Sequence, residues 1–247
     1  LIGIEQQVNM YALAASNMIL RGDGKANLYQ DDCFNPQIIT EVKARHPNIG
    51  FVNPPYSQKD SELNELLFVK NMLDMLDQGG IGIAIVPISC ATGDSPHKET
   101  ILKTHTLMAV MSMPTEIFYP VGVVTCIMVF KVGQPHAQSK QKSWFGYWKN
   151  DGFIKTKHRG RVDAQGSWPA IRDRWLGEFH NREIHAGRSV AQSVTSKDEW
   201  CAEAYMETDY SALTQEDFEE VLRNYAIFSL VTAAENESSP ASERTDD

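Results

Sequence analysis

The chain has 247 residues, of which 42% are hydrophobic, so it can form one large domain with a substantial core and a smaller second part. It has no run of about 18 apolar residues and no visible signal peptide, which argues against a membrane span and against secretion. The formal net charge of −9 argues against a protein that coats nucleic acid along its whole length.

Patterns typical of strands and helices alternate along the first half of the chain. Apolar residues recur at helical spacing over 5–19 and over 62–76, and Gly79-Gly80 ends the second of these runs. The expected elements are helices over 5–19, 36–44 and 62–76, and strands over 27–30, 49–52, 81–86, 106–113 and 123–132. This alternation predicts a doubly wound α/β sheet, in which ligands bind beyond the carboxyl ends of the strands. Glu5, Asp32 and Asn53 fall at predicted strand ends, so we expect them to line one crevice.

The sequence Asn53-Pro54-Pro55-Tyr56 directly follows the expected strand over 49–52. The two prolines fix φ and remove two N–H donors, and the first proline favours an extended Asn53. The Asn53 amide oxygen, the Pro54 carbonyl and the Tyr56 ring can then surround a planar group that carries an NH₂. The alternative is a Pro-Pro turn in which Asn and Tyr occur by chance.

Methylation of an exocyclic amine is the reaction that needs such a loop. The nitrogen lone pair is delocalised into the ring, so the amine is a poor nucleophile. Two acceptors on its hydrogens would favour a tetrahedral nitrogen and stabilise the positive charge that develops there. Tyr56 would stack on the base, which must leave the duplex to reach the loop.

In order and spacing, these motifs resemble those of the amino-directed DNA methyltransferases that carry an Asn-Pro-Pro-Tyr/Phe motif. The resemblance is strongest to the modification subunit of type I restriction systems and covers roughly residues 1–132. The matching segments are residues 2–5, 12–22, 30–34, 53–56, 79–87, 117–120 and 124–131.

The resemblance implies a Rossmann-like sheet and an enzyme that transfers a methyl group from S-adenosylmethionine to adenine N6 in double-stranded DNA, as part of a restriction-modification system. Glu5 would bind the ribose hydroxyls of the cofactor, and Asp32 with Cys33 would bind its adenine. Cytosine N4 is a second possible target. The alternative functions are an RNA or protein-glutamine methyltransferase and a non-catalytic scaffold.

One departure from the family concerns its first strand and Gly-rich turn, which should precede Glu5. Only four residues do, so we expect an N-terminally truncated fragment that lacks both. The patterns Gly22-Asp23-Gly24 and Gly80-Ile81-Gly82 do not stand between a strand and a helix, as such a turn requires.

Several site residues also have plainer interpretations. Glu5 could be a solvated acid at a helix N-terminus, and Asp31 or Asp32 could cap a turn. Phe34 is expected in the core rather than on adenine. The four cysteines, Cys33, Cys90, Cys126 and Cys201, form no C-x-x-C pair, and the seven histidines show no metal spacing. We therefore expect no metal, reduced thiols and a cytoplasmic location.

Charge divides the chain into parts. Residues 1–139, the expected partial catalytic domain, have a net charge of −4; residues 140–188, an α+β extension, have +6; and residues 189–247 have −11. Within the basic part, four cations follow a group of aromatic residues and are expected to bind the phosphate backbone, unless they form only a solvated basic turn. The cations are Lys155, Lys157, Arg159 and Arg161, and the aromatic residues are Trp144, Phe145, Tyr147, Trp148 and Phe153.

The acidic last part is expected to contain a helical segment over 189–234, with one helix over 211–228, and a disordered tail over 235–247. No target-recognition domain is visible. The family resemblance therefore implies a separate specificity subunit, and a restriction subunit, as partners.

Overall fold

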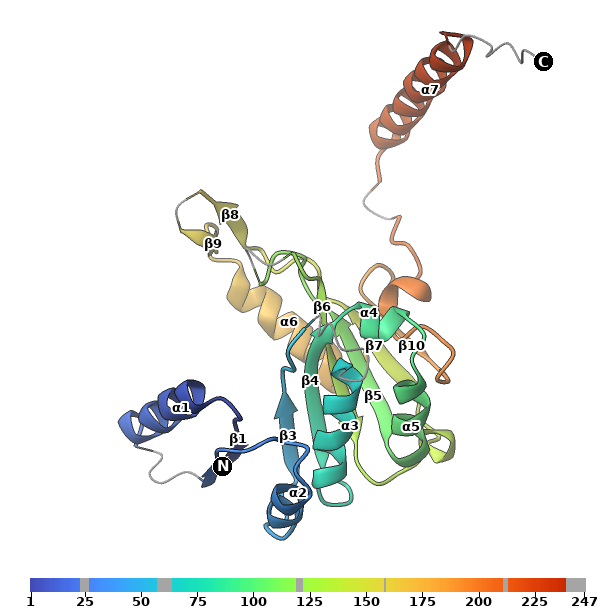
Figure 1. The fold of residues 1–247 in the computed structure, drawn as a ribbon. Helices are drawn as coiled ribbons and strands as arrows, with labels where there is room; N and C mark the ends of the chain where they lie inside the picture. Colours follow the sequence, from blue (N-terminus) through green and yellow to red (C-terminus); the bar gives the residue numbers. More distant parts are fainter. Residues whose placement is uncertain (23–26, 57–63, 119–121, 158, 211–212, 239–247) are drawn as a thin grey trace, which may run out of the picture. The chain divides into compact units, whose positions relative to one another are not determined.

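The described part of the chain alternates strands and helices over most of its length (Figure 1). The computed structural model describes residues 1–22, 27–56, 64–118, 122–157, 159–210 and 213–238, with side chains as far as residue 229. The strands are β1 (Ile2–Ile4), β2 (Asn27–Tyr29), β3 (Ile49–Val52), β4 (Ile81–Pro87), β5 (Thr106–Ser112), β6 (Thr125–Lys131), β7 (Ser143–Tyr147), β8 (Ile154–Thr156), β9 (Gly160–Val162) and β10 (Ser189–Gln192). The α-helices are α1 (Val8–Leu20), α2 (Pro36–Lys43), α3 (Glu65–Met75), α4 (Ser89–Thr92), α5 (Pro96–Thr104), α6 (Trp168–Asn181) and α7 (Gln215–Ser238), and the 3₁₀ helices are η1 (His136–Gln138) and η2 (Ala202–Ala204).

A six-stranded mixed sheet has the strand order β10-β7-β5-β6-β4-β3. β3 pairs in parallel with β4, and β5 in parallel with β7, while β6 runs antiparallel between β4 and β5. β3, β4, β5 and β7 therefore point the same way, and their carboxyl ends meet at one edge. This is the edge at which ligands bind in open α/β sheets.

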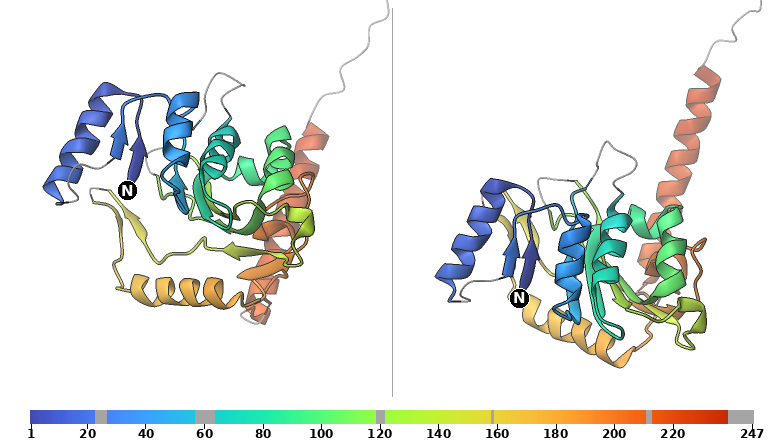
Figure 2. Two further views of the ribbon diagram at one scale, coloured as in Figure 1. Left: turned by 90° about the horizontal axis from the view of Figure 1, so that it is seen from below. Right: turned by 60° about the horizontal axis from the view of Figure 1, so that its bottom comes forward.

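The two faces of this sheet are covered by different helices (Figure 2). One face packs against α3, α4 and α5, and its core includes Leu66, Leu73, Val86, Ile101, Met128 and Phe130. The other face packs against α6, and its core includes Ala109, Met111, Val129, Trp144, Trp148 and Trp175. This is the layered α/β arrangement that the alternation of elements predicted.

The approach of α3 to the sheet is unusually close at two glycines. Gly50 and Gly82 are opposite one another in the β3–β4 pair. A Cβ on Gly50 would lie 2.3 Å from Met72 Sδ, and one on Gly82 would lie 2.2 Å from Leu73 Cδ2. The missing side chains therefore leave the space that α3 fills.

The first two strands form a sheet of their own, whereas the sequence predicted one continuous sheet. β1 and β2 pair in parallel with each other, and no strand in the described residues pairs with the outer edge of β3. Ile49 and Phe51 on β3 are accordingly 68% and 64% exposed. The small sheet instead packs through a separate apolar cluster in which Ile2, Ile4 and Tyr29 surround residues of α2 and α3.

Helix α1 has the expected place but not the expected buried face. None of its residues is buried, and Val8, Met10, Leu13, Ile19 and Leu20 are exposed. A sheet of two strands offers little surface for a helix to cover, so the apolar spacing of α1 is not matched by a core in the described residues.

The compact units also differ from the expected domains. The chain divides into Leu1–Glu207 and Thr208–Asp247. β7 and β10 belong to the ranges 140–188 and 189–234, which we expected to lie outside the catalytic domain, yet both pair in the six-stranded sheet. Because strands far apart in the sequence pair in this sheet, the domain that contains it does not end at residue 139.

The second unit contains α7. The first four residues of the expected tail, 235–238, belong to this helix, and 239–247 lie outside the described residues. Its apolar residues Phe218, Val221, Leu222 and Tyr225 are exposed. Among the described residues, no helix combines the length and the apolar character needed to cross a membrane.

We predict that Gly82→Ala lowers the free energy of unfolding by about 1–3 kcal/mol, because its Cβ would overlap Leu73 and push α3 from the sheet. Gly122→Ala is the control, since an added Cβ there meets nothing within 4 Å. Urea denaturation of both variants measures the difference, and equal stability of the two would contradict the close-packing account.

Candidate active site

The Asn53–Tyr56 loop begins where β3 ends, at the carboxyl edge of the six-stranded sheet. Pro54 is buried and anchors the loop, Asn53 and Pro55 are exposed, and Tyr56 is half-buried. The Tyr56 hydroxyl donates a hydrogen bond to Asn53 Oδ1 at 2.6 Å. It also lies 3.5 Å from the Ile85 carbonyl oxygen of β4. The tyrosine therefore fixes the orientation of the asparagine amide.

Tyr56 has a second neighbour that the sequence did not identify. The Phe118 ring meets it edge-on, with 6.1 Å between ring centroids. Burial raises the pKa of Tyr56, and nearby Cys126, Cys90 and Glu65 add to the rise. The hydroxyl thus stays protonated at neutral pH and remains a donor to Asn53.

Glu5 follows β1 and is half-buried. Its Oε1 accepts a hydrogen bond at 2.7 Å from the backbone N–H of Gln7, the N-cap residue of α1. Its own N–H donates to the Tyr29 carbonyl, at 3.0 Å, which extends the β1–β2 pairing by one residue. Glu5 is therefore both a helix-start acid, the plainer interpretation, and a carboxylate held at a strand end.

Asp31 and Asp32 follow β2, and their carboxylates have different hydrogen-bond partners. Both Asp31 carboxylate oxygens accept from Asn35 Nδ2 at 3.1 Å, and Asn35 in turn caps α2 by accepting from the Gln37 N–H. Asp32 is exposed, and its Oδ1 accepts from the Phe34 N–H at 2.9 Å. Asp31 thus supports the helix, and Asp32 keeps an accessible carboxylate at the edge where Glu5 also stands.

Helix α3 connects this edge to the rest of the molecule. Asn71 Nδ2 donates to the Cys33 carbonyl at 2.7 Å, and the Phe34 ring packs edge-on against the Phe68 ring, with 4.9 Å between ring centroids. Phe34 is half-buried and lies outside the buried core clusters, where we had expected it. A polar residue on an amphipathic helix has no local signal for such a contact, so the sequence missed Asn71. A single crevice shared by Glu5, Asp32 and Asn53 stays a prediction.

The four basic residues lie on the β8–β9 hairpin and differ in their surroundings. Arg161 forms a bidentate pair with the buried Asp151, at 2.7 and 2.8 Å, and its guanidinium lies over the Phe153 ring. Lys155 pairs with Glu116 at 3.4 Å. Lys157 and Arg159 are exposed near the turn. The last two are therefore the cations best placed to reach a phosphate.

Phe153 lies beside one of these cations, under the Arg161 guanidinium, but three other aromatic residues upstream do not accompany them. Trp144, Phe145 and Trp148 are buried in the two cores of the sheet. The prediction that these three residues lie beside the basic residues on a nucleic-acid surface was wrong, because the cores on the two faces of the sheet bury them. Among the described residues, no group of three His, Cys, Asp or Glu side chains could hold a metal ion.

Comparison with known proteins gives a family match over most of the chain. A family model described as N-6 DNA Methylase matches residues 1–208. The Type II restriction enzyme and methyltransferase RM.BcgI of Heyndrickxia coagulans is 35% identical over 237 residues, which are 92% of this chain and 37% of that protein. The chain thus spans little more than a third of this relative.

Solved structures share the fold. The methyltransferase subunit of a type I restriction-modification system from Streptococcus thermophilus aligns with a TM-score of 0.61 and 18% identity, over 78% of this chain and 44% of that one. The M protein of the type I restriction enzyme EcoKI aligns with a TM-score of 0.54 and 18% identity, over 69% and 40%. The Rossmann-like α/β fold expected from the sequence is confirmed.

We predict that Cys33 reacts slowly with alkylating reagents, because burial, reinforced by Asp32, raises its pKa from 9.0 to about 11. At pH 8 the rate should be about 100-fold below that of the same thiol in the unfolded chain, and it should rise about tenfold per pH unit until near pH 11. Mass spectrometry after timed iodoacetamide treatment measures this rate. Labelling of Cys33 as fast in the folded as in the urea-unfolded chain would contradict the prediction.

Proposed function

We propose a function from one premise: the chain belongs to the N-6 DNA methylase family. It transfers a methyl group from S-adenosylmethionine to the N6 amine of an adenine in double-stranded DNA, and the adenine is flipped out of the duplex to reach the loop. The Asn53–Tyr56 loop, with its amide fixed at the sheet edge, is the observation that carries this proposal.

The geometry explains how the loop handles the amine. An amide oxygen has two lone pairs, and the Tyr56 hydroxyl occupies one of those on Asn53 Oδ1. The other lone pair can accept one amine hydrogen, and the Pro54 carbonyl can accept the second. Both acceptors are fixed before the substrate arrives, so they stabilise the positive charge on nitrogen at little reorganisation cost. Tyr56 and Phe118 supply the aromatic surface for the base.

The cofactor edge carries acceptors that suit its ligand. S-adenosylmethionine supplies an electrophilic methyl group when bound. Its ribose hydroxyls and adenine amine are donors, and Glu5 and the exposed Asp32 end two parallel strands in register. The half-buried turn at Cys33, held by Asn71, would border the adenine.

DNA binding and assembly complete the proposal. Lys157 and Arg159 contact phosphates, while a separate specificity subunit selects the sequence and a restriction subunit can join the complex. The S. thermophilus and EcoKI proteins are subunits of type I systems, which supports this organisation. A DNA-modifying enzyme with four free cysteines fits the cytoplasm.

We predict that Asn53→Ala in the intact protein lowers methyl transfer at least about 100-fold, because it removes a preorganised acceptor of the amine. S-adenosylmethionine affinity and melting temperature should stay nearly unchanged. Tyr56→Phe keeps the ring but frees the amide, and should lower kcat about 10-fold. Transfer of tritium from labelled cofactor to DNA measures both effects.

Asn224→Ala is the matched control, since it removes an exposed amide on α7. Normal methylation by Asn53→Ala would rule out the role of the loop. Label that enters RNA or protein and not DNA would replace the proposed substrate.

We predict that the double variant Lys157→Ala/Arg159→Ala binds DNA about 10-fold more weakly at moderate salt, irrespective of sequence. The slope of log K against log salt should fall by about 2, one for each lost phosphate contact. Fluorescence anisotropy with unrelated duplexes measures both quantities.

A double variant of the exposed Lys43 and Lys103 removes the same charge elsewhere and is the control. An unchanged salt slope in Lys157→Ala/Arg159→Ala would refute the hairpin contact. Arg161→Ala should act differently. It leaves the buried Asp151 carboxylate without its ion-pair partner, so it should lower the stability of the protein more than its DNA affinity.

A further inference from the structure

A hollow of about 380 Å³ lies far from the Asn53 loop, and we call it the Arg182 hollow. Its lining comes from the start of β5, the segment entering β7, the end of α6 and β10, and comprises Thr106, Leu107, Met108, Gln141, Lys142, Trp144, Arg182 and Ala191. These residues lie toward the amino ends of β5 and β7. The proposed methylation site is at the opposite edge, about 20 Å away along a seven-residue strand.

Arg182 has an unusual backbone and an unsatisfied side chain. It ends α6 in the left-handed conformation, with φ 55° and ψ 38°, which costs energy in any residue with a Cβ. Its guanidinium lies 4.3 Å from the Phe179 ring centroid, and its Nη1 is buried without a hydrogen-bond partner. Partial burial of the guanidinium lowers the pKa of Arg182. Backbone strain and a buried donor without a hydrogen-bond partner at one residue are features typical of functional sites.

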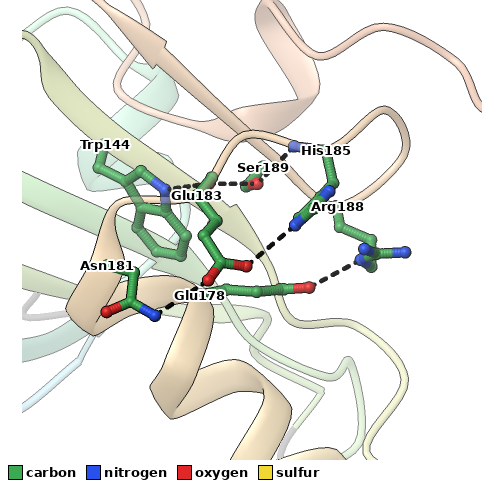
Figure 3. Close-up of polar contacts among 7 residues, drawn as sticks. All are labelled: Trp144, Glu178, Asn181, Glu183, His185, Arg188 and Ser189. Atoms are coloured by element: carbon green, nitrogen blue, oxygen red, sulfur yellow. Dashed lines mark hydrogen bonds and ion pairs between the residues drawn. The ribbon is translucent and has the colours of Figure 1, made fainter.

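The residues directly before and after Arg182, Asn181 and Glu183, are held by hydrogen bonds (Figure 3). Asn181 Nδ2 donates to Glu183 Oε1 at 2.9 Å. The Glu183 carbonyl accepts from Trp144 Nε1 and from Ser189 Oγ, both at 2.8 Å. These bonds fix the backbone immediately before and after Arg182, so its side chain is directed by the fold.

The same network uses the carboxylates that could have paired with Arg182. Glu183 Oε2 lies 3.1 Å from His185 Nε2, and the buried Glu178 accepts from Arg188 Nε at 2.8 Å (Figure 3). Within the described residues, no carboxylate comes within ion-pair distance of Arg182 or Lys142. Two cations thus border one hollow, and the two acids nearest to Arg182 in sequence, Glu178 and Glu183, are already engaged.

We propose that the Arg182 hollow binds a small organic anion, a phosphate or carboxylate on an aromatic or apolar body. Arg182, which lines the hollow and has no ion-pair partner among the described residues, donates to the oxyanion, and Lys142 provides the second charge. Met108, which is half-buried in the lining, contacts the apolar body, whereas Leu107 and Trp144 are each 1% exposed and belong to the cores of the sheet. Such a wall with a few placed polar groups is the usual composition of a small-molecule site.

Calorimetric titration of the intact protein with phenyl phosphate, benzoate and inorganic phosphate tests this site. One molecule of phenyl phosphate or benzoate should bind per chain, and the tighter of the two identifies the natural oxyanion. Inorganic phosphate should bind at least about 10-fold more weakly, since it has no body for the apolar wall. Binding of inorganic phosphate as tight as that of both organic anions would overturn the proposed ligand class.

Arg182→Gly separates binding from folding, because glycine adopts this left-handed conformation without strain. The variant should melt no lower than the native protein and should lose about 100-fold in affinity. Lys142→Gln should lose about 10-fold, and Lys140→Gln, an exposed lysine outside the lining, should bind normally. Absence of saturable binding in the native protein, or full affinity in Arg182→Gly, would overturn the proposal.

Discussion

The close approach of α3 to the sheet at Gly50 and Gly82 is the constraint on which the rest of the first unit depends. Two adjacent strands lack a side chain at the same level, so Met72 and Leu73 of the helix fill the space directly above the backbone. Close packing of this kind transmits strain, because protein interiors have few voids in which a displaced group can be accommodated.

From that position α3 reaches three other parts of the molecule. Asn71 and Phe68 hold the turn that carries Asp32 and Phe34, and Asp74 pairs with the buried His105 at 3.1 Å, beside the end of α5. The strand under the helix, β3, ends in the Asn53 loop. One helix therefore supports both the proposed acceptors of the amine and the turn proposed for the cofactor.

The partners of a cation in the fold, and not its position in the sequence, decide whether it is available to an external ligand. Arg161 and Arg188 each pair with a buried carboxylate, and Lys98, itself buried, donates to the Ala91 carbonyl at 2.6 Å and lies over the Trp200 ring. Such groups stabilise the fold and are unsuited to a surface ligand. Lys157 and Arg159 are exposed and are the cations that we propose bind phosphates, and Arg182 lines a hollow.

The sequence by itself determined what depends on near neighbours. The prolines after β3 mark the proposed catalytic loop, Pro36 starts α2, and the apolar spacing before Gly79 predicts α3. The order of these elements was enough for the α/β class. The bond between Tyr56 and Asn53 also spans only three residues, so the motif contains most of its own geometry.

Only the tertiary structure decided which surfaces are buried and which charges are paired. Trp144 and Trp148 looked accessible beside basic residues, and they lie in the core because β7 pairs with β5 and β10, far away in sequence. The spacing of α1 suggested a buried face that two short strands cannot cover. Strand pairing and ion pairing join residues across tens of positions, and no local pattern encodes the free energy of those contacts.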